Sequence, residues 1–218
     1  MWQQKRGTGG TKMANGDALD LWQAAWEECV GDKDLSNARV GGRATKANPN
    51  KEDVAQWQIQ GPAWVENYIA WRKGNPEWQI WKTPQGIPAI ELGLNPSIAG
   101  VTIKMSIDRV FQVGDELVIV DLKTSQNVPP SALQLGFYKY GMEEQFHIPI
   151  NFGTFYMARQ SGTCDMIDLS WYTAEKLEYL VSQFDKARKA GIFMPNADSC
   201  FICGFTAICE FSSKRKGK

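Results

Sequence analysis

Two aspartates and a lysine in the middle of the chain are of the types that phosphodiester hydrolysis needs. Asp121 and Lys123 stand two residues apart in the apolar run Val118–Lys123, which is typical of a strand. Side chains alternate along a strand, so these two are expected to point the same way. A carboxylate can hold a divalent cation, and an ammonium can orient a water and screen a phosphate. Taken alone, so short a motif favours an ordinary ion pair on a half-exposed strand.

Further carboxylates come from the preceding strands. Asp108 ends the apolar segment 101–108, and residues 112–115 (Gln-Val-Gly-Asp) predict a hairpin turn before the strand of Asp121. If the strands pair across that turn, Asp108 and Asp121 come side by side. Glu91, in a strand expected over 87–94, is either a third metal-site carboxylate or an exposed strand residue. With the backbone carbonyl of Leu122, these oxygens are the ligands that Mg²⁺ or Mn²⁺ prefers.

A helix expected over residues 131–145 carries two polar groups at matching positions. Gln134 and Tyr138 are four residues apart and therefore share one helix face. An amide and a phenol can each donate a hydrogen bond to a phosphate without neutralising a metal ion. The alternative is a partly buried helix face with no role in binding.

Segments 106–110 (Ser-Ile-Asp-Arg-Val), 120–125 (Val-Asp-Leu-Lys-Thr-Ser) and 134–138 (Gln-Leu-Gly-Phe-Tyr) follow one another in a distinctive order. In order and spacing they resemble the motifs of PD-(D/E)XK superfamily nucleases. The match is closest to the RecB-like exonucleases of the fourth CRISPR-associated protein family, including phage-type members. Segment 88–93 (Pro-Ala-Ile-Glu-Leu-Gly) is similar to an upstream part of the same family. The resemblance covers roughly residues 60–211.

The resemblance implies a metal-dependent DNA exonuclease that acts on single-stranded ends. Asp108 and Asp121 would hold the metal with help from Glu91 and the Leu122 carbonyl, and Lys123 would activate the attacking water. Gln134 and Tyr138 would contact the DNA backbone near the scissile phosphate. The expected fold is α/β, a central mixed sheet flanked by helices, with a C-terminal cysteine clasp.

Three cysteines are clustered near the C-terminus, at Cys200, Cys203 and Cys209. In a chain with no disulfide pattern, such close spacing suggests an iron–sulfur cluster, a zinc site or buried free thiols. The resemblance favours a structural [4Fe–4S] cluster with one further cysteine from the N-terminal part. Cys29 is the candidate for that ligand, whereas Cys164 is expected to be a small buried residue.

The N-terminus departs from the pattern of the resembling family. Members carry a cysteine and then a Gly-Thr-x-x-His motif whose histidine is a metal ligand. Here Gly10 and Thr11 are present, but Ala14 stands at the histidine position and Cys29 follows the motif. Either the chain is a truncated version of a longer protein, or Cys29 has taken the role from a new position. The single histidine, His147, is expected to serve a loop or packing role.

Composition limits the alternatives. The chain has 218 residues, nine tryptophans and equal numbers of acidic and basic residues, 24 of each. A single domain with a substantial core is expected, without a global basic signature for nucleic acid. Local basic patches and site carboxylates can cancel in the total, so a nuclease is not excluded. No apolar run suits a membrane span and no signal peptide is evident, which predicts the cytoplasm of a bacterial or phage-infected cell.

The expected single nuclease domain covers 1–218. It consists of a helical or irregular region over 1–50, a core over 51–192, the cysteine motif over 193–211 and a basic tail over 212–218. Within it, helices are predicted over 17–29, 52–73 and 173–190, the second interrupted near Gly61-Pro62. The aromatic residues of the helix over 52–73 could stack unpaired bases, but their spacing along one face favours core packing.

Two alternative functions remain open on the sequence alone. One is a DNA-binding accessory module that keeps the fold but has lost catalysis with its histidine. The other is a zinc-stabilised interaction protein that does not bind nucleic acid. DNA is the expected partner of both the exonuclease and the accessory module. No membrane partner is expected, and the residues do not reveal the oligomeric state.

Overall fold

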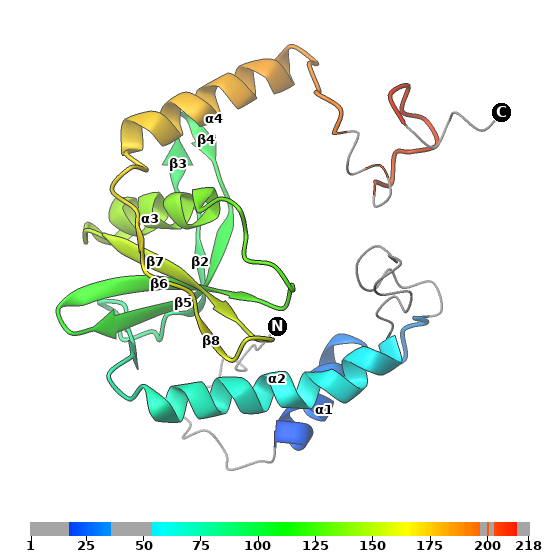
Figure 1. The fold of residues 1–218 in the computed structure, drawn as a ribbon. Helices are drawn as coiled ribbons and strands as arrows, with labels where there is room; N and C mark the ends of the chain where they lie inside the picture. Colours follow the sequence, from blue (N-terminus) through cyan, green and yellow to red (C-terminus); the bar gives the residue numbers. More distant parts are fainter. Residues whose placement is uncertain (1–17, 36–53, 197–199, 201–202, 213–218) are drawn as a thin grey trace.

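The structure, a computed structural model, describes residues 18–35, 54–196, 200 and 203–212 (Figure 1). The helices are α1 (Ala18–Cys29), α2 (Val54–Gly74), α3 (Leu133–Phe146) and α4 (Ala174–Lys189). The strands are β1 (Gln79–Ile80), β2 (Ile90–Leu94), β3 (Ser97–Ile98), β4 (Val101–Thr102), β5 (Met105–Val113), β6 (Glu116–Lys123), β7 (Phe152–Met157), β8 (Gly162–Thr163) and β9 (Ile167–Asp168). The predicted helices over 17–29, 131–145 and 173–190 are confirmed within a few residues.

A mixed sheet forms the centre of the molecule. Its strands are ordered β1-β5-β6-β7-β8, with β2 also pairing with β5 and β9 with β7. β5 and β6 are an antiparallel hairpin, whereas β6 and β7 are parallel. Parallel neighbours need a crossover connection, and α3 supplies it. The expected α/β class with a mixed sheet flanked by helices is confirmed.

The β5–β6 hairpin follows the alternation of its sequence. Val113 pairs with Glu116 at the tight end, where Gly114 adopts a φ of 59° that favours glycine. The predicted turn over 112–115 is therefore confirmed. From there the register runs to the pair Arg109 and Val120. Because the turn fixes the register, the next positions outward are Asp108 and Asp121.

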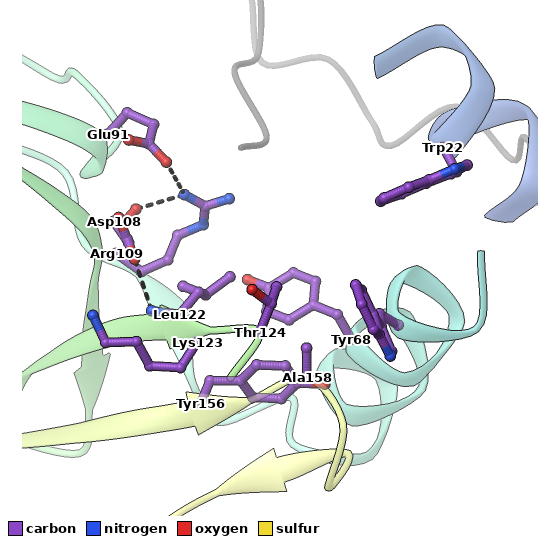
Figure 2. A pocket seen from close by; sticks show the side chains of 11 residues that line it. Trp22, Tyr68, Glu91, Asp108, Arg109, Leu122, Lys123, Thr124, Tyr156 and Ala158 are labelled. Carbon is purple, nitrogen blue, oxygen red and sulfur yellow. Dashed lines mark hydrogen bonds and ion pairs between the residues drawn. The ribbon is translucent and has the colours of Figure 1, made fainter. Parts of the chain in front are cut away.

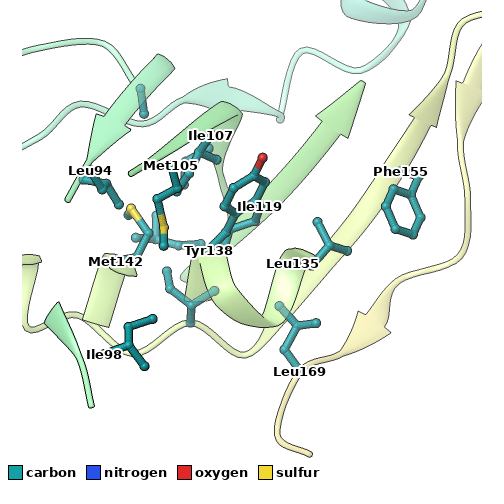
Figure 3. Packing of buried hydrophobic residues seen from close by; sticks show 14 of the residues in the cluster. Leu94, Ile98, Met105, Ile107, Ile119, Leu135, Tyr138, Met142, Phe155 and Leu169 are labelled. Atoms are coloured by element: carbon teal, nitrogen blue, oxygen red, sulfur yellow. The ribbon is translucent and has the colours of Figure 1, made fainter. Parts of the chain in front are cut away.

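The main core lies between the sheet and helix α3. Leu135, Tyr138 and Met142 of α3 pack against strand residues such as Ile107 and Ile119 (Figure 3). Helix α4 covers the same side, with Leu177 and Val181 buried. Gly136 and Gly141 let side chains lie against the α3 backbone, since a Cβ there would meet Tyr172 or Met105 within 3 Å. Helix α3 is thereby fixed on the sheet.

A second, aromatic core lies on the opposite face of the sheet. Phe111, Val118, Val120, Tyr156 and Ala158 are buried there, under the tryptophan and tyrosine side chains of α2 and the segment after it. Trp71, for example, contacts Phe111 and Tyr156 with ring centroids 5.9 and 5.2 Å apart. The prediction that these aromatic residues pack in a core is confirmed.

The predicted interruption at Gly61-Pro62 is wrong, because α2 continues through both residues as one helix. Proline removes one backbone hydrogen bond, a cost that tertiary packing can offset. The packing comes from α1, whose Trp22 ring lies over Gly61. Gly61 is therefore a contact point for α1.

Several predicted features lie outside the described residues. They are the Gly10-Thr11 segment with Ala14, most of the linker over 33–50 and the basic tail after Ser212. The division into regions along the chain stays a prediction. Among the helices that the structure describes, none has the length and apolar character needed to cross a bilayer.

Candidate active site

Three neighbouring strands place one carboxylate each at the same level of the sheet. In the β2–β5 ladder, Ile90 pairs with Arg109 and Leu92 with Ile107, so Glu91 and Asp108 occupy the position between. Asp108 is also the residue opposite Asp121 when the β5–β6 register is continued by one step. The row Glu91, Asp108 and Asp121 therefore crosses β2, β5 and β6.

The regular alternation of side chains is interrupted at this row. Ile107 and Val110 both lie in the main core although they are three positions apart, as do Ala89 and Leu92 on the neighbouring strand. Glu91 has a φ of 49°, in the left-handed region that non-glycine residues rarely adopt. Irregular positions of this kind commonly occur beside active sites, where they redirect a side chain. Here the irregular positions are at or next to Glu91 and Asp108, so these acidic side chains do not follow the regular alternation.

Asp108 binds directly to the adjoining strand. Its Oδ2 accepts a hydrogen bond from the backbone N–H of Leu122 at 2.7 Å. The side chain thus takes the place of a backbone acceptor where the ladder between β5 and β6 ends at Arg109 and Val120. The prediction that the two aspartates come side by side is confirmed.

Asp121 is a buried carboxylate in an unfavourable electrostatic setting. It is 2% exposed, and burial raises its pKa, with repulsion from Asp108 and Glu91 adding to that effect. Lys123 acts in the opposite direction, since its Nζ lies 2.5 Å from Asp121 Oδ2. Apart from this ion pair, Oδ2 has no partner among the described groups. A buried oxygen of this kind is suited to a cation.

Lys123 joins the strand to helix α3. Its Nζ donates to Gln134 Oε1 at 3.1 Å, and Gln134 Nε2 donates to the Tyr138 hydroxyl at 2.7 Å. The expectations that Asp121 and Lys123 share a strand face and that Gln134 and Tyr138 share a helix face are confirmed. Burial is the main cause that raises the pKa of Tyr138, and repulsion from Asp121 would make its phenolate still less favourable. Tyr138 therefore stays a neutral phenol.

Arg109 is a site residue that the sequence motifs do not single out. It is 5% exposed, its Nη1 lies 3.6 Å from Glu91 Oε1, and the same nitrogen donates to the Asp108 carbonyl at 2.5 Å. Ser106 Oγ donates to the other Glu91 oxygen at 3.4 Å. Its position within an apolar strand sequence could have marked Arg109 as a site residue, because a buried charge is generally paired with another charged group.

Some of these groups line a cleft of about 200 Å³, whereas Asp121, Gln134 and Tyr138 are not part of its lining. Glu91, Asp108, Arg109, Lys123 and Thr124 line it, together with Leu122, Tyr156 and Ala158 (Figure 2). Trp22, Trp64 and Tyr68 from the helices α1 and α2 complete the lining. Two segments far apart in sequence thus meet at the site. The contribution of α1 to the cleft is not apparent from the sequence, because it depends on how α1 packs against α2.

Neither set of predicted metal ligands forms a complete centre in the part of the chain that is described. No three His, Cys, Asp or Glu side chains there are grouped as metal ligands. This applies to the three carboxylates and also to Cys29, Cys200, Cys203 and Cys209, which are all free thiols. Iron–sulfur or zinc binding by the cysteines stays a prediction. The carboxylate site differs, because Mg²⁺ is commonly bound through only one or two carboxylates and otherwise by water and phosphate oxygens.

His147 and Cys164 do not line the cleft. His147 ends helix α3 in a left-handed conformation with φ 57°, and its backbone N–H donates to the Glu143 carbonyl. Cys164 is half-buried, and burial raises the pKa of its thiol. Its backbone N–H and C=O bind Phe155 and Thr154, so this residue belongs to the sheet edge.

The mixed sheet flanked by helices, with a hairpin that carries Asp108, Asp121 and Lys123, is consistent with the fold of PD-(D/E)XK nucleases. The chain belongs to the PD-(D/E)XK nuclease superfamily, whose sequence model matches residues 3–210. Members of this superfamily are generally nucleases, and metal-dependent nuclease activity is the function that membership suggests.

Two phage proteins are similar to this chain. One is the Gene 69 protein of Mycobacterium phage D29, 28% identical over 217 residues that cover 88% of this chain and 80% of the phage protein. The other is the Gene 69 protein of Mycobacterium phage L5, 30% identical over 171 residues, 66% of this chain and 58% of the phage protein. The chain thus spans less than two thirds of the L5 protein.

Proposed function

We propose that this chain is a RecB-like, metal-dependent DNA exonuclease that hydrolyses phosphodiester bonds at single-stranded ends. The observation that carries the proposal is that Asp108 and Lys123 line one cleft while the buried Asp121 lies behind them, with Lys123 Nζ 2.5 Å from Asp121 Oδ2. The exonuclease and single-strand parts are supported by the resemblance to the fourth CRISPR-associated protein family.

The donor set fits a hard divalent cation. Asp108 and Asp121 would hold Mg²⁺ or Mn²⁺, with Glu91 and the Leu122 carbonyl as further oxygen donors. Two observations support this fit: Glu91, Asp108 and Asp121 lie on adjacent strands, and their mutual repulsion adds to burial in raising the pKa of Asp121, which a cation would offset. When bound, the cation supplies positive charge to the phosphate oxygens and makes a coordinated water more acidic.

The protein groups around this site each have a definable task. Lys123 is held from two sides, by Asp121 and by Gln134 Oε1, so its ammonium is positioned to orient the attacking water and to offset charge on the phosphate. Gln134 and Tyr138 present an amide and a neutral phenol as donors toward the DNA backbone. Arg109 screens Glu91 and so limits repulsion within the carboxylate row.

Digestion of end-labelled linear and covalently closed circular single-stranded DNA tests the proposal. The linear substrate should disappear with Mg²⁺ or Mn²⁺, the circle should persist, and EDTA should stop the reaction. Lys123→Ala should lower the rate by roughly 10²- to 10⁴-fold. Lys104→Ala, at an exposed lysine outside the cleft, is the matched control and should keep the wild-type rate. Intact linear DNA under both metals would refute the catalytic proposal.

A second candidate function is a DNA-binding accessory module with the same fold. It is favoured by the absence of a complete ligand group among the described carboxylates and by the ion pair that Glu91 forms with Arg109. Such a protein would bind DNA ends and leave them whole. The same digestion, run beside a gel-shift measurement on the linear substrate, separates the two functions.

We also propose a [4Fe–4S] cluster held by Cys29, Cys200, Cys203 and Cys209, with zinc as the alternative metal. Support comes from the close spacing of the C-terminal cysteines and from their free thiol state. Elemental analysis after anaerobic purification tests it: iron and acid-labile sulfide identify a cluster, and zinc without iron identifies the alternative. The proposed cellular setting is the cytoplasm of a phage-infected bacterium, in keeping with the two mycobacteriophage relatives.

A further inference from the structure

The cleft has two unlike walls. On one side lie the charged groups Asp108, Arg109 and Lys123, and on the other lie aromatic rings from α1 and α2. Figure 2 shows Trp22 across the cleft from Asp108. We infer that Trp22 and Trp64 form a stacking subsite for an unpaired nucleobase next to the phosphodiester at the carboxylates. This inference rests on the proposed function and specifies the substrate as a single-stranded end.

Trp22 packs against Gly61 of α2 outside the two cores. It is absent from the residues of the main core and from those of the aromatic core, unlike Trp64 and Trp71. Its ring is half-exposed and stands edge-on to Trp64, with centroids 6.4 Å apart and planes at 89°. The two rings therefore form a corner of the cleft, with aromatic surface available to a ligand.

The position of the Trp22 ring depends on a residue that lowers the stability of helix α2, Gly61. A Cβ at Gly61 would lie 2.2 Å from carbons of the Trp22 ring, so only glycine allows the ring to lie there. Glycine within a helix costs about 1 kcal/mol relative to alanine. The following proline adds a further cost to the same turn of α2. Glycine at position 61 is therefore what allows the Trp22 ring to lie against α2.

A cation completes the wall. The Arg159 guanidinium lies 4.7 Å from the centroid of the Trp64 ring, and its Nε donates to the Thr124 carbonyl at 2.6 Å. Thr124 directly follows Lys123 and lines the cleft. Aromatic faces next to arginine and lysine are the usual means of binding single strands, because every base has a π-face and every phosphate a charge. Bases in a duplex are already stacked and paired, so this wall favours unpaired ends.

Two variants and one control test the subsite. Trp22→Ala removes the ring, and Gly61→Ala keeps every aromatic residue but displaces the ring of Trp22. Trp26→Ala is the matched control, since Trp26 is also half-exposed on α1, with its ring centroid 5.8 Å from that of Trp22, but does not line the cleft. The probes are an end-labelled oligothymidylate and the same oligomer with abasic terminal positions.

Both cleft variants should raise KM for the oligothymidylate roughly 10-fold, the usual effect of losing one stacked base. They should leave KM for the abasic oligomer unchanged, and wild-type protein should already bind that oligomer as weakly as the variants do. Trp26→Ala should match the wild type on every substrate.

The inference is overturned if the cleft variants keep the wild-type KM, or if the abasic and intact oligomers bind wild-type protein equally. Loss of the proposed function gives a different result, namely no hydrolysis of any probe by wild-type protein with Mg²⁺ or Mn²⁺. In that case fluorescence anisotropy with the two labelled oligomers replaces KM. Weaker binding of the oligothymidylate by Trp22→Ala and Gly61→Ala then supports the subsite, and equal binding overturns it.

Discussion

The Asp108 carboxylate accepts a hydrogen bond at 2.7 Å from the backbone N–H of Leu122, where the ladder between β5 and β6 ends. One residue therefore holds two strands together and contributes a negative charge to the cleft. Stability and activity can be separated at this position, because only the hydrogen bond survives replacement by an amide.

Asp108→Asn should keep the protein stable, since the amide oxygen can still accept from Leu122. Asp108→Ala leaves that N–H without its acceptor and should lower the free energy of unfolding by about 1 kcal/mol more. In both variants the nuclease rate should fall by at least roughly 100-fold. This is the lower limit of the rate effect usually seen when one group that stabilises the transition state is removed. Urea unfolding and DNA digestion measure the two effects, and equal stability of the variants would contradict the structural role.

Asp121→Asn should abolish nuclease activity and yet stabilise the protein above the raised pKa of Asp121. Burial and the neighbouring carboxylates raise this pKa above 3.8, so the folded state holds its proton to higher pH than the unfolded state. The wild type therefore gains stability as pH falls through the folded pKa, whereas the amide of the Asp121→Asn variant does not titrate.

Unfolding in EDTA at a series of pH values measures the difference. The advantage of Asp121→Asn should be largest above the raised pKa and should shrink as the pH falls through it. Adding Mg²⁺ should stabilise the wild type and leave the variant unchanged. An advantage that is independent of pH would show that the carboxylate is not strained by its surroundings.

Glu91→Gly should be more stable than Glu91→Ala by about 1 kcal/mol, because the φ of 49° disfavours any residue with a Cβ. Both variants lose the same ion pair with Arg109, so their difference isolates the backbone conformation. Thermal unfolding of the two proteins side by side measures it. A more stable alanine variant would mean that position 91 has ordinary strand geometry.

Tyr138→Phe should lower the nuclease rate roughly 10-fold, because Gln134 loses the hydroxyl that fixes its amide and in turn positions Lys123. Burial raises the pKa of Tyr138 above its ordinary value of 10.0, so the phenol stays protonated and does not titrate in the assay range. The alkaline limb of the pH–rate profile should therefore be the same in both proteins. A shifted limb would assign the titration to Tyr138.

Local periodicity predicted how the candidate residues are arranged, and the family resemblance singled them out as candidates. Alternation placed Asp121 and Lys123 on one face, and the turn at Gly114 fixed the register that brings Asp108 beside Asp121. Helical spacing likewise placed Gln134 and Tyr138 together. These relationships depend on residues close in sequence or joined by one short turn, so the pattern of residues specifies them.

Other features of the site depend on contacts between distant segments. The left-handed conformation of Glu91 and the burial of Arg109 arise where alternation is interrupted on two paired strands, which no single-strand pattern reveals. The continuous path of α2 through Pro62 runs against its local propensity. It is stabilised by packing that is absent from an isolated helix.

The sequence by itself determined the fold class, the hairpin and the acidic and basic groups at its open end, because period, turn chemistry and spacing are local properties. Tertiary structure alone decided that Trp22, on a helix far from Asp108 in the chain, lines the same cleft as Glu91 and Asp108, as Figure 2 shows. The physical reason is that Gly61 leaves room for the Trp22 ring only when α1 packs against α2. That contact depends on the packing of two whole helices and cannot be seen in the local sequence.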